Sequence, residues 1–98
     1  MMSHDNLIDI FSRELLVSGA LTFGEYRLRS GRISPYYIDL RILISKPRLL
    51  SIAVEMISRL IDDLPLRPTK LCGIPMTGAL LVSAIAVSKN IPGIYVCL

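Results

Sequence analysis

The sequence predicts an α/β fold in which a helix and a β-hairpin precede the first part of a parallel sheet. The later half of the chain has the order strand, helix, strand, which is typical of a parallel βαβ unit. The earlier half begins with helical periodicity and continues with alternating residues between glycines. The 98 residues favour one domain, and the 52% hydrophobic content excludes intrinsic disorder.

The first predicted element is a helix over about residues 6–18. Its apolar residues recur three and four positions apart, as on one face of an amphipathic helix. Ser3 or Asp5 can cap the start of this helix, and Gly19 suits a left-handed residue at its end. The residues expected on the apolar face are Leu7, Ile8, Phe11, Leu15 and Leu16.

A predicted hairpin follows this helix. Gly24 and Gly31 are interpreted as turns, and residues 25–29 as a half-buried strand with Tyr26 and Leu28 on its buried face. The alternation of apolar and basic side chains along this strand is the observation behind the interpretation.

The next predicted strand covers residues 36–40, with Pro35 at its entry. A second helix should then be capped by Ser45, carry Pro47 in its first turn and end near Asp63. Pro47 is tolerated there because the first amides of a helix have no intrahelical acceptor.

The last three predicted elements are a strand over residues 70–74, a helix over 77–88 and a strand over 93–98. Parallel strands covered on both faces are apolar throughout, which explains a mean hydropathy of +0.55. Cys72 and Cys97 stand alone in these segments and are expected as buried thiols in a reducing compartment. We expect the partners of these apolar faces beyond the end of the chain.

Two classes of partner are disfavoured. The net charge of +3 suits an anionic ligand, but few aromatic residues are interleaved with Arg27, Arg29 and Arg32, so a solvated basic hairpin is favoured over nucleic-acid binding. The uncharged run over residues 71–88 just reaches the length of a membrane span, but Pro75 and two glycines favour a strand–loop–helix unit, and no membrane association is expected.

The loop over residues 73–79 is the first candidate site, because α/β sheets bind ligands where a strand leads into a helix N-terminus. Gly73 and Gly78 have the spacing of an ATP-binding P-loop, but Ala79 replaces the lysine, which argues against one. Two interpretations stay open: an ordinary strand–helix turn, or a loop whose backbone binds phosphate.

The hairpin is the second candidate site. Basic side chains beside Ser30 and Gly31, followed by Tyr36 and Tyr37, have the chemistry to hold an anion and a flat ring. The alternative is that these residues are surface charges and packed aromatics. No spacing of Cys and His predicts a metal site, and His4 as the single histidine provides no Ser–His pair.

Three segments carry a family pattern: residues 19–41 (GALTFGEYRLRSGRISPYYIDLR), 45–50 (SKPRLL) and 72–80 (CGIPMTGAL). Together they resemble orotate phosphoribosyltransferase, especially the form in bifunctional uridine monophosphate synthase. The resemblance extends over residues 16–96 and implies a type I phosphoribosyltransferase-like fold. It implies that residues 1–98 are the N-terminal part of one such domain, with 1–44 as a helix and hairpin subregion and 45–98 as the start of the α/β core.

The family transfers a phosphoribosyl group from phosphoribosyl pyrophosphate to orotate, with magnesium, in UMP biosynthesis. Its members are cytoplasmic homodimers that share a mobile catalytic loop. The resemblance assigns Tyr37 and Ile38 to orotate, Arg29 to the phosphoribosyl donor, and Met76 and Thr77 to pyrophosphate. Arg29 stands where the family has lysine, and Met76 stands where it has tyrosine.

The family's catalytic loop and ribose-binding carboxylates have no counterpart in these 98 residues, so the resemblance assigns no catalytic residue and no metal ligand. Magnesium is expected to arrive with phosphoribosyl pyrophosphate. We expect an incomplete N-terminal fragment that is inactive alone. The alternative is a non-catalytic interaction module that pairs with a full-length phosphoribosyltransferase subunit, with the strand near Leu98 as an open sheet edge.

Overall fold

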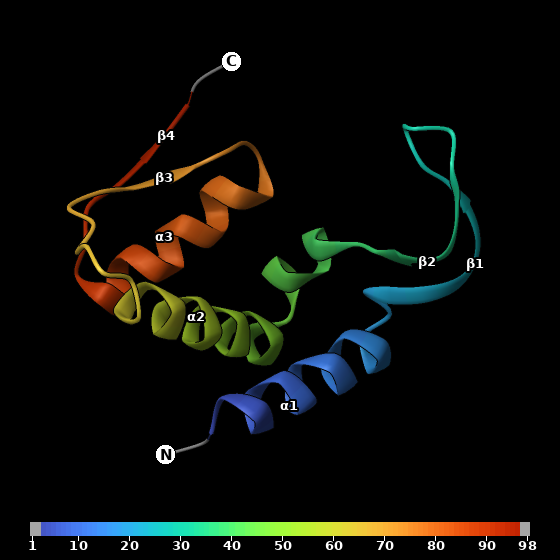
Figure 1. Cartoon of the computed structure of the whole chain (residues 1–98), viewed down its shortest axis with the longest axis horizontal. Coiled ribbons are helices and arrows are strands. Elements are labelled where there is room, and N and C mark those ends of the chain that lie inside the picture. Colours follow the sequence, from blue (N-terminus) through green and yellow to red (C-terminus); the bar gives the residue numbers. More distant parts are fainter. Residues whose placement is uncertain (1–2, 97–98) are drawn as a thin grey trace.

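A computed structural model describes residues 3–96 and contains two small sheets connected by helices. Strands β1 and β2 pair antiparallel, and β3 and β4 pair parallel with α3 between them, which confirms the α/β class and the βαβ unit. Figure 1 shows the hairpin and the βαβ unit at separate ends of the molecule. The elements are α1 (His4–Val17), β1 (Leu21–Arg27), β2 (Ile33–Ile38), the 3-10 helix η1 (Leu40–Ser45), α2 (Pro47–Asp62), β3 (Leu71–Gly73), α3 (Thr77–Lys89) and β4 (Gly93–Tyr95).

Helix α1 confirms the first prediction, with a start two residues earlier. Ser3 is its N-cap, and the Asn6 amide donates to the Ser3 hydroxyl at 3.2 Å. Gly19 has a φ of +83°, a conformation that glycine adopts without the steric penalty of a side chain. Leu7 and Leu15 are buried, whereas Ile8 and Leu16 of the predicted apolar face are exposed.

The first strand of the hairpin differs from its prediction. Gly24 lies inside β1, at a register shift between Phe23 and Tyr26, so the predicted turn at Gly24 is wrong. Pro35 lies inside β2 opposite this irregularity, because Phe23 pairs with Tyr36 and Tyr26 pairs with Ser34. A proline is tolerated in a strand where the ladder of hydrogen bonds is interrupted.

The hairpin turn begins earlier than predicted. Leu28 and Arg29 lie in the turn rather than in the strand, and the Leu28 amide donates to the Arg32 carbonyl at 2.8 Å. Leu28 is therefore exposed, not part of a buried face. The alternation of apolar and basic residues correctly indicated a strand, but β1 ends at Arg27. The hydrogen bond between Leu28 and Arg32 places Leu28 and Arg29 in the turn.

The N-terminus of α2 is also corrected. Ser45 ends η1, and its hydroxyl donates to the Ile42 carbonyl at 2.9 Å, so it is not the N-cap. Lys46 takes the cap position without a side-chain hydrogen bond, and Pro47, the first helical residue, lies in the first turn as predicted. The local 3-10 helix shifts the cap by one residue, because its last turn engages the serine that would otherwise have capped α2.

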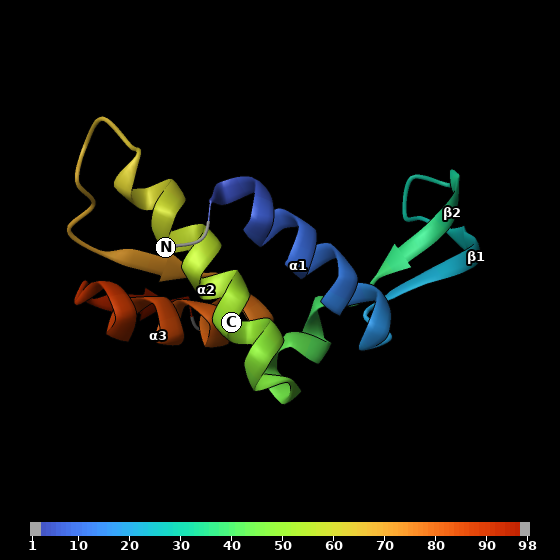
Figure 2. The same ribbon diagram turned by 90° about the horizontal axis from the view of Figure 1, so that it is seen from below.

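The principal core lies where α1, β1, η1 and α2 meet. Leu43 of η1 and Leu49 of α2 are almost fully buried there, at 2% and 1% exposure. Figure 2 shows α1 and α2 side by side, with η1 between α2 and the hairpin. We call this cluster the central core; its buried residues are Leu15, Ala20, Leu43, Leu49 and Ala53.

The parallel sheet of β3 and β4 has few neighbours among the described elements. Among the described elements only α3 packs against β3 and β4, whereas α2 packs against α1, α3 and η1. Cys72 is consequently exposed, which corrects the expected burial of its thiol. Ile94 and Tyr95 are exposed as well, and Cys97 lies outside the described residues.

The end of β3 approaches the first turn of α3 very closely. A Cβ atom placed on Gly73 would lie 2.5 Å from the Ala79 Cα and 2.8 Å from the Gly78 carbonyl oxygen. Both contacts are with backbone atoms, so no side-chain rotation relieves them. A glycine at this position therefore permits the tight connection between β3 and α3.

Two further sequence expectations concern the whole chain. None of the helices within residues 3–96 is long and apolar enough to cross a membrane. Helix η1 extends across the expected boundary between residues 1–44 and 45–98, and that division stays a prediction.

We expect Leu49→Ala to lower the free energy of unfolding by about 2–5 kcal/mol, because it leaves a cavity in the central core. Urea unfolding followed by circular dichroism measures this change. Leu66→Ala is the matched control, because Leu66 is 80% exposed and its truncation should change stability by less than about 0.5 kcal/mol. Equal unfolding midpoints for the two variants would contradict the assigned core.

We expect Gly73→Ala to lower the thermal unfolding midpoint, since the added methyl group overlaps the α3 backbone. Gly78→Ala is the control: its Cβ would meet only the Ile74 Cβ at 3.9 Å, an ordinary contact. That variant should match or slightly exceed the wild-type stability, because alanine favours helix. Differential scanning calorimetry distinguishes them, and a wild-type midpoint for Gly73→Ala would show that the close approach is not required.

Candidate functional site

The first group of predicted site residues lies at the N-terminus of α3. Met76 precedes the helix and is 74% exposed, and Thr77 is its first residue and partly buried. The peptide bond between Pro75 and Met76 is cis. The Ala79 amide donates to the Ile74 carbonyl at 3.1 Å, which holds the loop against the helix.

This helix start has the properties that favour an anion. The first amides of a helix lack intrahelical acceptors and carry a partial positive charge. The amides of Ala79 and Leu80 donate to the carbonyls of Ile74 and Met76. The amides of Thr77 and Gly78 are the first two of the helix. The Thr77 hydroxyl adds a further possible donor at the same place.

An apolar pocket of about 500 Å³ lies beside this loop. Because β3 and β4 are parallel, Tyr95 at the end of β4 emerges at the same edge as the loop after β3. Sequence reasoning missed this pocket, because the predicted strand over residues 93–98 placed Tyr95 inside the strand, whereas β4 ends at Tyr95. Its lining residues are Pro75, Met76, Ala79, Leu80, Ser83, Tyr95 and Val96.

The second group of predicted site residues lies on the hairpin. Tyr37 and Ile38 end β2, and the Tyr37 ring lies 5.6 Å from the Tyr26 ring, centroid to centroid. The Tyr26 hydroxyl donates to the Thr22 hydroxyl at 3.0 Å, which holds the neighbouring ring. Arg29 lies in the turn at the opposite end of β2, so the hairpin separates it from Tyr37 along the strand.

The turn carries the charge predicted for it. Arg27, Arg29 and Arg32 are all exposed, and no ion pair within residues 3–96 engages them. Their positive charge therefore remains available to an anionic ligand. The roles of Arg29, Tyr37, Ile38, Met76 and Thr77 stay predictions from the resemblance.

The described residues do not bring the two groups together. Beyond its chain connections, the hairpin packs against α1 alone among the described elements, whereas the loop after β3 belongs to the unit of β3, α3 and β4. Figure 1 shows η1 between these two parts of the molecule. The two groups thus lie on different elements, and η1, which follows β2 and packs against α3, lies between them.

Sequence reasoning also missed an ion pair directly after β2. Arg41 donates from Nε and Nη2 to the two carboxylate oxygens of Asp39, at 2.8 and 2.9 Å. The Arg41 hydrogen bonds hold the pKa of Asp39 below its usual value. Opposite charges two residues apart, at the end of the predicted strand over residues 36–40 and directly after it, were the available signal.

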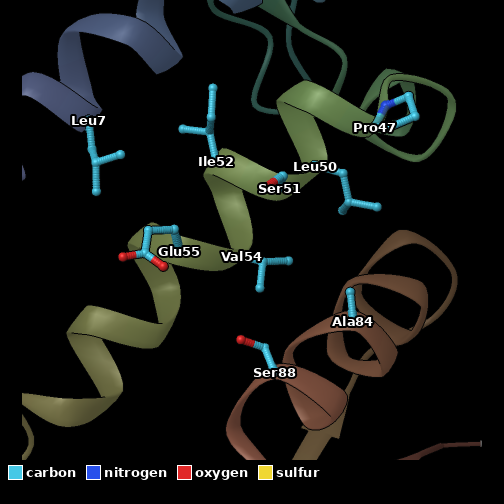
Figure 3. Close-up of a pocket in the computed structure, with 9 residues that line it drawn as sticks. All are labelled: Leu7, Pro47, Leu50, Ser51, Ile52, Val54, Glu55, Ala84 and Ser88. Atoms are coloured by element: carbon cyan, nitrogen blue, oxygen red, sulfur yellow. The ribbon is translucent and has the colours of Figure 1, made fainter. Parts of the chain in front are cut away.

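A groove of about 490 Å³ follows α2 between α1 and α3, away from both groups. In Figure 3, Leu50 and Val54 of α2 point toward Ala84 and Ser88 of α3, and Leu7 approaches from α1. None of the five predicted site residues lines this groove. It is a packing groove between helices and is not part of the candidate site.

The described residues contain no cluster of three or more His, Cys, Asp or Glu side chains that could hold a metal ion. The five predicted site residues contribute no carboxylate or imidazole, which are the common protein ligands of metal ions.

No family model matches the sequence. The chain is 38% identical over 74 residues to an orotate phosphoribosyltransferase of Chlamydia pneumoniae, and the aligned region covers 76% of this chain and 34% of that protein. It is 33% identical over 92 residues to the uridine 5'-monophosphate synthase of Bos taurus, and the aligned region covers 94% of this chain and 19% of that protein. The chain therefore spans about a third or less of these two relatives.

Solved structures agree with this similarity. The UMP synthase of Leishmania donovani superposes with a TM-score of 0.79 and 29% identity, over 88% of this chain and 19% of that chain. The orotate phosphoribosyltransferase of Aeropyrum pernix gives a TM-score of 0.74 and 27% identity, over 89% of this chain and 52% of that chain. In sequence and in architecture, this chain resembles a part of the orotate phosphoribosyltransferases, and its fold is that of the type I phosphoribosyltransferases.

Proposed function

We propose that the chain carries part of the orotate and phosphoribosyl pyrophosphate sites of an orotate phosphoribosyltransferase. That activity converts orotate and phosphoribosyl pyrophosphate into orotidine monophosphate and pyrophosphate in UMP biosynthesis. The observation that supports it most strongly is the loop of residues 73–77, which follows a parallel strand and opens a helix in a fold that superposes on a UMP synthase with a TM-score of 0.79.

In this proposal the loop binds the pyrophosphate part of the donor. The amides at the start of α3 and the Thr77 hydroxyl are donors suited to phosphate oxygens. Met76 has no hydroxyl, so its side chain contributes apolar contact rather than a hydrogen bond. Backbone donors thus carry most of the recognition, and the absence of a tyrosine hydroxyl removes one contact.

The hairpin binds orotate and the donor's negative charge. Tyr37 and Ile38 provide a partly apolar surface for the flat pyrimidine ring, and Arg29 provides a permanent positive charge. Arg29 retains the charge of the family's lysine but spreads it over a planar guanidinium group. Among these residues we assign binding and orientation roles only, and no catalytic residue.

Transfer of the phosphoribosyl group requires stabilisation of the negative charge on the departing pyrophosphate. The amides and Thr77 at the α3 N-terminus would provide part of it. Magnesium, bound through the donor's own phosphates, would neutralise further charge. We further propose that the complete enzyme is cytoplasmic and forms a homodimer.

An interaction module is the second candidate. Ile94, Tyr95 and Met76 are large apolar residues exposed around the edge of the βαβ unit, and β3 and β4 each have one open strand edge among the described strands. Open edges and exposed apolar side chains recruit partner chains. The partner in this case would be a full-length phosphoribosyltransferase subunit.

We expect the purified chain to bind inorganic pyrophosphate without forming orotidine monophosphate. Thr77→Val should weaken pyrophosphate binding about fivefold, which corresponds to one lost hydrogen bond. Isothermal titration calorimetry measures the affinity. Thr69→Val is the matched control, since Thr69 lies in the exposed segment before β3 and should bind as wild type does. Equal affinities of the two variants would contradict the role of Thr77, and turnover by the chain alone would contradict its expected inactivity.

For the interaction module, we expect the chain to co-elute with a full-length orotate phosphoribosyltransferase in size-exclusion chromatography with light scattering. Tyr95→Ser should reduce the co-eluting fraction several-fold, because it removes an apolar side chain that is 70% exposed. Val87→Ser on the exposed side of α3 is the control for loss of an exposed apolar residue. A monomer that elutes separately from the enzyme at micromolar concentration would exclude this candidate.

A further inference from the structure

A backbone hydrogen bond joins the end of β2 to the central core. The Asp39 amide donates to the Ala20 carbonyl at 2.8 Å, and Ala20 belongs to the central core. The donor, Asp39, directly follows Tyr37 and Ile38 in the chain. The hydrogen bond therefore closes the base of the hairpin beside the residues proposed to bind orotate.

The side chain of Asp39 reinforces the same place. Its carboxylate accepts from the Arg41 amide at 3.1 Å and caps η1. The Arg41 guanidinium adds two parallel hydrogen bonds to that carboxylate, at 2.8 and 2.9 Å. A two-point contact of this kind defines an orientation as well as a distance. The Asp39 side chain is 24% exposed, and that of Arg41 is 78% exposed.

The pKa of Arg41 is raised above its usual value, chiefly by its hydrogen bond and charge interaction with Asp39 and to a smaller extent by Tyr37. The low pKa of Asp39 means that its carboxylate is ionised at neutral pH, and that the ion pair is lost only when the pH falls through that lowered value. The pair is therefore intact under physiological conditions.

The hairpin has few other restraints. Among the described elements it packs against α1 only, and most of its large side chains are exposed. A hairpin with so few packing contacts is free to change its angle to the body unless its base is fixed. The junction at Asp39 therefore adds a polar restraint on Tyr37 and Ile38 to their pairing with Thr22 and Leu21 of β1.

We propose that Asp39 and Arg41 are positioning residues of the orotate site, whose two-point ion pair holds the end of β2 so that Tyr37 and Ile38 keep their place relative to η1. The proposal rests on the proposed function for the identity of the ligand. It goes beyond that function in assigning the ion pair a role that needs no contact with orotate.

The test compares Asp39→Asn and Arg41→Lys with wild type in the 98-residue chain. Asp39→Asn keeps an acceptor for the Arg41 amide but removes the negative charge. Arg41→Lys keeps the positive charge but removes the planar guanidinium group that donates two parallel hydrogen bonds. Arg13→Lys is the matched control, because Arg13 pairs with Asp9 on the exposed surface of α1. Circular dichroism establishes that each variant is folded, and Arg41→Gln replaces any variant that is not.

Three measurements by nuclear magnetic resonance follow. Orotate titration should show affinity reduced about fivefold in both test variants and unchanged in the control. The heteronuclear Overhauser effect at the Tyr37 and Ile38 amides should fall in the test variants, which reports increased motion. The pKa of Asp39 should rise toward its usual value in Arg41→Lys and stay low in Arg13→Lys.

The outcomes distinguish failure of the positioning role from failure of the proposed orotate binding. Unchanged orotate affinity and unchanged amide motion in both test variants would overturn the positioning role. Reduced affinity in Arg41→Lys alone would also overturn it, because that result indicates direct contact between Arg41 and orotate. If wild type binds no orotate, the proposed ligand is wrong, and the amide motions alone decide whether the ion pair fixes the hairpin.

Discussion

Burial of Leu43 and Leu49 against α1 is the contact on which the other parts of the structure depend. Leu43 lies on η1, a single short helix that follows the hairpin and leads into α2. Because the same cluster includes Ala20 before β1, it fixes both ends of the hairpin at one point. Helix α2 then packs against α3, so the βαβ unit is connected to the hairpin through this cluster.

The two candidate ligand-binding groups are held by different physical means. The loop before α3 is constrained by backbone packing, because Gly73 lies against the backbone of Gly78 and Ala79. The hairpin is constrained by polar contacts at its base, where Asp39 bonds with Ala20 and Arg41. Steric exclusion allows little movement, whereas an exposed ion pair is weaker and depends on charge. We therefore expect the hairpin to be the more adjustable of the two groups.

The hydrophobic content of the chain has a structural counterpart in its surface. Large apolar side chains such as Phe23, Ile94 and Tyr95 are exposed, and the parallel sheet has α3 on one face. A small domain has too little volume to bury every apolar residue, so some exposure is expected at this length. The concentration of exposed apolar residues around β4 is the feature that favours a partner for the βαβ unit.

The sequence by itself determined the secondary structure with strong local signals. Periodic apolar residues defined α1 and α2, Gly19 ended α1, and the order of strand, helix and strand predicted the parallel pair. The segments resembling orotate phosphoribosyltransferase also provided the five candidate site residues. The helices, the helix end and the parallel pair depend on residues close together in the chain, where spacing and backbone preference are sufficient. The site residues, in contrast, come from the resemblance alone.

Only the tertiary structure decided the features that depend on distant contacts. Sequence alternation could not show that Gly24 lies at an irregularity opposite Pro35, because that depends on the register between two strands. It could not show that Cys72 is exposed, since exposure depends on which helices cover the sheet. The separation of Arg29, Tyr37 and Ile38 from Met76 and Thr77 has the same origin. Their spacing along the chain contains no information on how η1 and the central core set the hairpin apart from the βαβ unit.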